Sequence, residues 1–214
     1  MRDLPAPPIA QTIAQARVPP QKVARSELIL GGQKSGKSRR AENLAMQWLA
    51  DSPDHRAVLI ATAQAWDDEM RARITRHQSD RADRLPGMTT VEEPLALAQA
   101  LTQYSHPNTL VVIDCLTLWL TNWLFPAQSS DAAVKPAFVH KDKALSATLI
   151  EAINAAPGPV VLVGNEIGLG VIPLGVETRA FVDALGLLNQ SVAQVCQRAT
   201  LMAAGLPLFL KDTP

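Results

Sequence analysis

The chain of 214 residues is poor in cysteine, in net charge and in long apolar runs, and each shortage excludes a class of protein. Its two cysteines, Cys115 and Cys196, are too few for a disulfide framework and lack metal-ligand spacing, so we expect both in a core and the protein in the cytoplasm. Basic and acidic residues each number 20, so no overall charge favours nucleic acid or an anionic membrane as a partner. The most apolar tract, residues 111–125, is interrupted by Asp114 and is shorter than the ~20 residues that span a bilayer, so we predict no membrane segment.

One domain is predicted for residues 26–214, because the length suffices for one sizeable core and no internal repeat divides it. Residues 1–25 carry five prolines and lack both the apolar region and the cleavage site of a signal peptide. We expect them to form a flexible, proline-rich N-terminal extension without chemistry of its own.

A phosphate-binding pattern occupies residues 28–42, LILGGQKSGKSRRAE, where an apolar run is followed by a glycine loop, Lys-Ser and a helical pattern. The segment from Gly31 to Ser38 matches G-x-x-x-x-G-K-[ST]. Glycines let successive backbone N–H groups surround an anion, Lys37 would reach the outer phosphates, and the hydroxyl of Ser38 would bind Mg²⁺. The alternative is a Gly-Ser turn that matches the pattern by chance.

Runs typical of buried strands alternate with helical patterns along the rest of the chain. The expected strands are residues 27–30, 57–62, 89–91, 109–114 and 159–164, with one or two closing strands in 199–203 and 206–211. The expected helices are residues 38–50, 67–78, 94–104, 137–155 and 178–198. This alternation predicts an α/β fold of the P-loop NTPase-like, RecA-like type, in which a mainly parallel sheet carries helices on both faces.

Two expected strands end in polar residues, at the edge where open α/β sheets bind ligands. Thr62 and Gln64 follow the second strand. Asp114 ends the run TLVVID, which is the way a P-loop protein places a carboxylate near its magnesium. A strand-end aspartate that caps a loop is the alternative for Asp114.

The segment 67–78 has acidic residues first and basic residues later, the charge order that a helix dipole favours. Trp66, Met70 and Ile74 recur at intervals of four and are predicted to face the core. His77 lies at the edge of this stripe, where the residues alone favour a partly packed surface histidine over a catalyst. The arginines around His77 form a basic neighbourhood, for which a solvated helix face is the alternative interpretation.

Five ordered blocks then form a recognisable set, which consists of GGQKSGKSRRAE at 31–42, ATAQAWDDEMRARITRH at 61–77, TVEEPL at 90–95, DCLTLWLTN at 114–122 and GNEIGLGVIP at 164–173. Together they resemble the bifunctional adenosylcobinamide kinase and adenosylcobinamide-phosphate guanylyltransferase family of cobalamin biosynthesis. The resemblance implies phosphorylation of adenosylcobinamide with ATP or GTP, followed by transfer of GMP from GTP, through a guanylylated histidine, to give adenosylcobinamide-GDP. The family's R-I-x-x-H block is residues 73–77 here, so the resemblance makes His77 the nucleophile.

The same resemblance assigns the other site residues. The phosphate cradle is formed by Gly31, Gly32, Gln33, Lys34, Ser35, Gly36, Lys37 and Ser38, with Lys37 catalytic. Further nucleotide contacts are Thr62, Ala63, Gln64, Gln78, Ser79, Asp80, Arg81, Glu92 and Asp114, with Ser38 and Asp114 as Mg²⁺ ligands. A homo-oligomer is also implied. Val182 and Leu187 stand where the family has two arginines of the late helix.

Two rival hypotheses remain open at this point. The first is a P-loop small-molecule kinase without guanylyltransferase activity, in which His77 is structural. The second is a nucleotide-gated binding module or regulator, which would show an exposed apolar patch and no turnover with any acceptor. Incubation with GTP labelled at the α-phosphate separates the bifunctional enzyme from the simple kinase.

Overall fold

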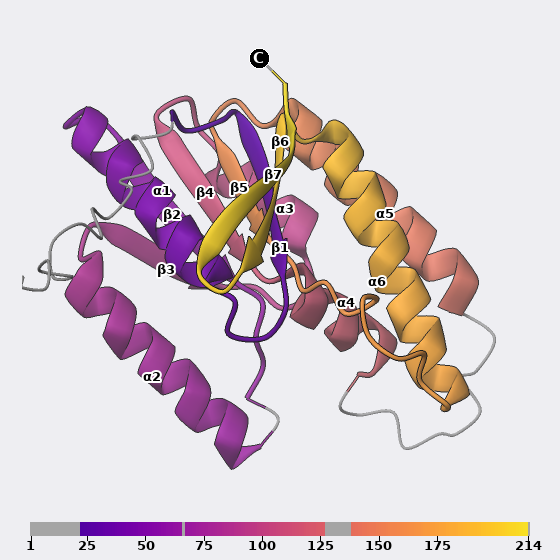
Figure 1. Ribbon diagram of the computed structural model, residues 1–214. Helices are drawn as coiled ribbons and strands as arrows, with labels where there is room; N and C mark the ends of the chain where they lie inside the picture. Colours follow the sequence, from indigo (N-terminus) through magenta and orange to yellow (C-terminus); the bar gives the residue numbers. More distant parts are fainter. Residues whose placement is uncertain (1–21, 66, 127–137, 214) are drawn as a thin grey trace, which may run out of the picture.

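The computed structural model describes residues 22–65, 67–126 and 138–213 (Figure 1). Within these ranges the side chains of residues 73, 77, 80, 82, 83 and 138–143 are outside the description. Most of the expected N-terminal extension, residues 1–21, also lies outside the described residues.

Strands and helices alternate along the described chain. They are β1 (Ser26–Gly31), α1 (Lys37–Asp51), β2 (Arg56–Ala61), α2 (Asp68–Arg84), β3 (Met88–Glu92), α3 (Leu97–Tyr104), β4 (Thr109–Asp114), α4 (Leu116–Leu124), α5 (Phe138–Ala155), β5 (Val160–Val163), α6 (Val176–Val195), β6 (Arg198–Ala203) and β7 (Leu206–Asp212). The strands form one sheet in the order β3-β2-β4-β5-β1-β6-β7, parallel except for the antiparallel pair β6–β7. The predicted α/β fold with a mainly parallel sheet is confirmed.

The core has two layers, one on each face of the sheet (Figure 1). Successive side chains of a strand point to opposite faces, so Leu28 joins the cluster beneath α3, α4, α5 and α6, whereas Ile29 joins the cluster beneath α1. Strands that are buried on both faces read as continuous apolar runs, and this is why β1, β4 and β5 could be found from the sequence. None of the described helices combines the length and apolar composition needed to cross a bilayer.

Both cysteines lie in this core, as expected. Burial, together with the nearby charge of Asp114, raises the pKa of Cys115 to about 12. Burial raises the pKa of Cys196 to about 12 as well. Because thiolates are the reactive form, both thiols stay protonated and inert at neutral pH.

The prediction that one face of α2 lies in the core is wrong for the residues that the structure describes. Met70 and Ile74 are only half-buried and belong to neither core cluster, and Trp66 lies outside the described residues. α2 also runs on to Arg84, past the expected end at residue 78, and the N–H of Leu85 closes its last turn on Arg81 O at 2.7 Å. Charged residues favourable to the helix dipole extend the helix, while its few apolar residues cannot bury it.

Other boundaries also differ from the expectation. α3 begins at Leu97 and not at Pro94, because the carboxylate of Glu93 accepts hydrogen bonds from the N–H groups of Leu95 (2.9 Å) and Ala96 (2.7 Å) just before the helix. α6 ends at Val195, and Arg198 opens β6 instead of closing the helix.

The last residues of the expected extension, Lys22 to Arg25, are packed on the domain. The carbonyl of Lys22 accepts a hydrogen bond from Arg198 at 3.1 Å, and the N–H of Arg25 donates to Gln197 Oε1 at 2.7 Å. Ala24 is buried. The folded unit therefore includes residue 22, four residues before the expected boundary at residue 26.

Candidate functional site

The glycine loop connects β1 to α1, and its backbone explains two of its glycines. Gly31 has φ 152°, and a Cβ there would lie 2.5 Å from both the carbonyl oxygen of Met202 and Ser35 Oγ. Gly36 has φ 102° at the N-cap of α1, in the left-handed region that side chains rarely adopt. The glycine spacing of the sequence motif is therefore a steric requirement of this turn.

Lys37 opens α1 and folds back over the loop. Its Nζ donates a hydrogen bond to the carbonyl oxygen of Gly32 at 2.6 Å, and the residue is only 9% exposed. The ammonium group is thus held beside the loop backbone, within the concavity that the motif offers to an anion.

Ser38 and Asp114 meet at the end of the sheet, although they are 76 residues apart in the chain. Ser38 Oγ donates to Asp114 Oδ2 at 2.9 Å. A hydroxyl and a carboxylate oxygen beside a phosphate loop are ligands that Mg²⁺ uses, since this ion keeps several waters and takes few protein ligands. The described residues hold no cluster of three or more His, Cys, Asp or Glu that could bind a metal ion.

Thr62 holds the turn that follows Asp114. It is fully buried, and its hydroxyl both donates to the Cys115 carbonyl (2.7 Å) and accepts from the Cys115 N–H (2.8 Å). Asn122 Nδ2 donates to the Thr62 carbonyl at 2.8 Å. The Thr62 hydroxyl is therefore used within the protein, and a nucleotide contact by this residue stays a prediction. Ala63 and Gln64, which follow it, are half-buried.

Two further segments lie against the loop. The N–H of Glu166, in the loop after β5, donates to Gly31 O at 3.1 Å, so this loop lies against the first glycine of the P-loop. The N–H of Gly205, in the β6–β7 turn, donates to Ser35 O at 3.0 Å. The contact from the β6–β7 turn was missed, and only the Ala-Gly pair of a tight hairpin hinted at a backbone approach.

Asn122 and Asn189 were also missed as site-supporting residues. Both are almost fully buried, and Asn189 Nδ2 donates to the Asn165 carbonyl at 3.1 Å. A polar residue inside an otherwise apolar helical stretch was the available signal, because a buried amide must find hydrogen-bond partners.

The expected contacts 78–81 lie on α2, in helix and not in a loop. Gln78 Nε2 donates to Glu92 Oε1, at the end of β3, at 3.1 Å, which joins two predicted site residues. Ser79 is exposed, the Nε of Arg81 is buried without a hydrogen-bond partner, and the Asp80 side chain is not described. His77 precedes Gln78 on this helix, and its side chain is likewise not described.

Of the cradle residues, Gly32, Gln33 and Lys34 are exposed at the surface of the loop, and Lys34 has φ 55°. Ser35 is buried, and its Oγ has no hydrogen-bond partner. A buried hydroxyl without a partner, set in a loop of exposed backbone groups, is a donor available to a ligand.

Comparison with known proteins finds both a family and individual relatives. The family model described as cobinamide kinase / cobinamide phosphate guanyltransferase matches residues 27–210. The bifunctional adenosylcobalamin biosynthesis protein CobP of Pseudomonas aeruginosa is 44% identical over 191 residues, which cover 88% of this chain and 98% of that protein. The bifunctional adenosylcobalamin biosynthesis protein CobU of Escherichia coli is 34% identical over 187 residues, which cover 86% of this chain and 98% of that protein.

Among solved structures, a protein of Pyrococcus horikoshii OT3 matches with a TM-score of 0.52 and 8% sequence identity. The match covers 91% of this chain and 89% of that one. At this identity the likeness concerns the fold alone.

Proposed function

Because this chain belongs to the cobinamide kinase / cobinamide phosphate guanyltransferase family, we propose that its P-loop binds the nucleotide for both activities and that His77 carries GMP between them. The protein is a bifunctional enzyme of cobalamin biosynthesis, a kinase and a guanylyltransferase. The observation that carries the site assignment is the meeting of Ser38 with Asp114 at 2.9 Å, beside the loop that holds Lys37.

In the kinase step, the hydroxyl of adenosylcobinamide attacks the γ-phosphorus of ATP or GTP, and the nucleoside diphosphate leaves. Lys37 and the loop N–H groups stabilise the charge on the phosphate oxygens. Ser38 and Asp114 would hold Mg²⁺, which when bound neutralises phosphate charge. Lys37 leaves its present bond to the Gly32 carbonyl when phosphate oxygens offer it stronger, charged acceptors.

In the transferase step, the imidazole of His77 attacks the α-phosphorus of GTP, so that an N–P bond forms and pyrophosphate leaves. The phosphate of adenosylcobinamide phosphate then attacks the same phosphorus, which releases the histidine and gives adenosylcobinamide-GDP. A histidine with the reference pKa of about 6.5 is largely neutral near pH 7 and therefore nucleophilic. Arg76 and Arg81, on the same helix, supply positive charge near the phosphates.

The remaining nucleotide contacts, Gln64, Gln78 and Glu92, are proposed on the basis of position. Gln78 and Glu92 are already hydrogen-bonded to each other beside the histidine-bearing helix. Their exposed polar groups are suited to a nucleotide base or ribose placed between the P-loop and α2.

We also propose that the enzyme works in the cytoplasm as a homo-oligomer. Two protonated, buried thiols suit a reducing compartment. The segment after β5 exposes Leu169 by 79%, Val171 by 96% and Leu174 by 96%, and exposed apolar groups in such number are typical of protein interfaces. Light scattering of the purified protein measures the oligomeric state directly, and a monomer at micromolar concentration would contradict this part.

The proposed function is tested by following GTP consumption with and without adenosylcobinamide and identifying the products by mass spectrometry. We expect adenosylcobinamide phosphate first and adenosylcobinamide-GDP with pyrophosphate later. A reaction that stops at the phosphorylated corrinoid, with GTP in excess, would identify a simple kinase. No nucleotide turnover with any acceptor would identify a binding module.

A further inference from the structure

A buried carboxylate interrupts the apolar strand that leads into the P-loop. Glu27 lies on β1 between buried neighbours and is 0% exposed. Burying an unpaired charge is costly, so such a group persists only where partners compensate it. The catalytic scheme above does not use Glu27, although it lies only four residues before the first glycine of the loop.

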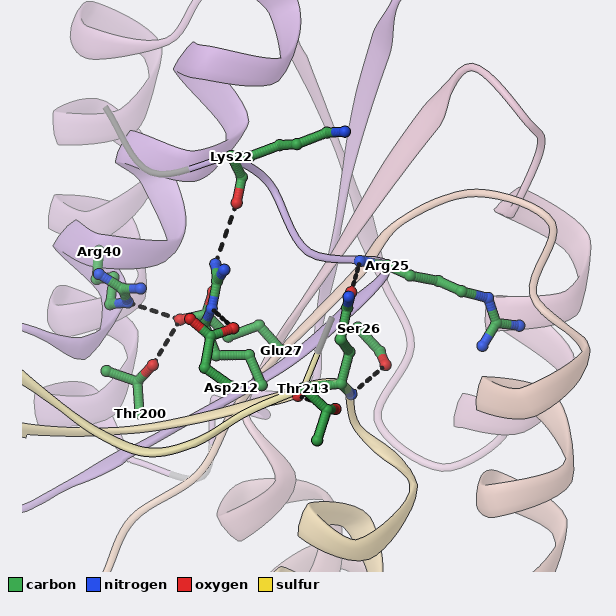
Figure 2. Close-up of polar contacts among 10 residues, drawn as sticks. Lys22, Arg25, Ser26, Glu27, Arg40, Thr200, Asp212 and Thr213 are labelled. Carbon is green, nitrogen blue, oxygen red and sulfur yellow. Dashed lines mark hydrogen bonds and ion pairs between the residues drawn. The ribbon is translucent and has the colours of Figure 1, made fainter. Parts of the chain in front are cut away.

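The first partner of Glu27 is on the other side of the loop. Arg40, in the first turn of α1, donates from Nε to Glu27 Oε1 at 2.7 Å, and their side chains are 11% and 0% exposed (Figure 2). This ion pair joins the strand before the loop to the helix after it. The two ends of the P-loop are therefore connected directly by an ion pair between β1 and α1.

The second set of partners comes from the β6–β7 hairpin. Thr200 Oγ1 donates to Glu27 Oε1 at 2.8 Å (Figure 2). Arg198 Nη1 donates to Glu27 Oε2 at 3.3 Å. The ring of Phe209, on β7, lies 5.2 Å from the Arg40 guanidinium and 5.9 Å from that of Arg198. The hairpin that contacts the loop through Gly205 is thus fixed to α1 and β1 at the same carboxylate.

We propose that Glu27 and Arg40 are positioning residues of the P-loop, whose ion pair fixes the first turn of α1 against β1. That turn carries Lys37 and Ser38, so the pair sets both groups relative to Asp114 without touching the nucleotide. The inference rests on the proposed function only in that the loop binds nucleotide. Phosphoryl transfer depends on positioning, and displacements of about 1 Å at a reacting group can cost about a hundredfold in rate.

The test compares Arg40→Gln with Asp212→Asn. Asp212 accepts from Arg198 Nε at 2.9 Å and is 41% exposed, so it belongs to the same network but, among the described residues, is bonded to Arg198 on β6 and not to Arg40. Both variants are assayed well below their melting temperatures, where circular dichroism shows them folded. For Arg40→Gln we expect kcat of the kinase to fall about tenfold and the Kd for GTP to rise, whereas Asp212→Asn keeps both near wild type.

A purely structural role predicts a different result, in which Arg40→Gln lowers the melting temperature but leaves kcat and the Kd for GTP unchanged in the folded fraction. That result would overturn the proposal. Glu27→Gln provides a second variant, since the amide keeps an acceptor for Thr200 but loses the charge that binds Arg40, and we expect it to match Arg40→Gln in kcat. Arg40→Lys, which restores the charge, should recover part of kcat.

The GTP-binding measurement needs no corrinoid, and this separates the two claims. Wild-type protein that binds GTP but does not act on adenosylcobinamide would contradict the proposed function and leave the positioning role testable through Kd. Arg40→Gln protein that binds and turns over GTP as the wild type does would contradict the positioning role alone.

Discussion

Helix α1 carries Lys37, the cation of the P-loop, and helix α2 carries His77, the proposed nucleophile. The two helices are packed against the rest of the protein in very different ways. α1 buries Lys37, Ala41, Glu42, Leu44 and Ala45 against the sheet. α2 has no buried residue among those whose side chains are described, and Figure 1 shows it at the margin of the molecule beside the edge strand β3. Lys37, the proposed phosphate-binding group, is thus built into the core, whereas the helix that carries His77, the proposed nucleophile, lies outside it.

The described contacts of α2 lie near its middle and at its C-terminal end. At its last turn Arg84 Nη1 donates to Glu42 Oε2 on α1 at 2.9 Å, and Leu85, just beyond, is buried in the core cluster beneath α1. Near its middle, the exposed Gln78–Glu92 bond connects the described part of the helix to the sheet. Elements with few buried apolar contacts have low local stability, which suits a group that must meet GTP and then a second phosphate.

The largest effect is expected from Lys37→Ala, which removes a positive charge from α1, the more deeply buried of the two helices. Kinase kcat should fall by about a hundredfold or more, because catalysis at this site is electrostatic and positional. Steady-state phosphorylation of adenosylcobinamide measures it. Unchanged turnover would contradict the assignment of the loop.

Truncations in the two helices compare their packing directly. Leu44→Ala in α1 should cost about 2–5 kcal/mol of unfolding free energy, since Leu44 is 3% exposed. Met70→Ala in α2 should cost less than about 1 kcal/mol, since Met70 is half-buried and outside both core clusters. Urea titration measures both, and equal losses would show that α2 is packed as firmly as α1.

Asp114→Asn tests the proposed Mg²⁺ ligand. The amide can still accept from Ser38 Oγ but has lost the negative charge, so we expect kinase activity to fall about tenfold at limiting Mg²⁺ and to recover partly at high Mg²⁺. A titration of activity against Mg²⁺ concentration measures this. An unchanged Mg²⁺ dependence would mean that Asp114 only caps the turn.

Arg84→Gln is expected to have the smallest effect on activity, and it tests most closely whether α1 and α2 act independently. The pair with Glu42 has side chains 40% and 10% exposed, so its loss should cost below about 1 kcal/mol. We expect guanylyl transfer to slow about threefold while phosphorylation stays unchanged, because only α2 is loosened. Glu42→Gln is the matched variant on the α1 side, and a fall in kinase activity with either change would show that the two helices are coupled.

Local spacing was enough to predict one part of the site. The loop from Gly31 to Ser38 is contiguous, and the rule that parallel strands end at one edge brought Asp114 to it. The sequence also signalled β1, β4 and β5 through their apolar runs. These features depend on neighbours in the chain or on a general rule of topology.

The features that were missed depend on partners far apart in the chain. Thr200, 173 residues after Glu27, compensates a carboxylate that reads in the sequence as an ordinary polar residue of a strand. Thr62 pairs with Cys115 across 53 residues, and nothing in the neighbouring sequence indicates this partner. The interval-of-four pattern of α2 predicted a buried face, but no layer of the fold covers the described part of it.

The central claim, that His77 on the loosely held helix carries GMP, is tested most directly with GTP labelled at the α-phosphate. His106, exposed between α3 and β4, offers the matched control as His106→Ala. We expect acid-labile, base-stable label on the wild type and on His106→Ala, and none on His77→Ala, which should still phosphorylate adenosylcobinamide. Acid-labile GMP that persists on folded His77→Ala protein would contradict the claim, because the nucleophile would then be another residue.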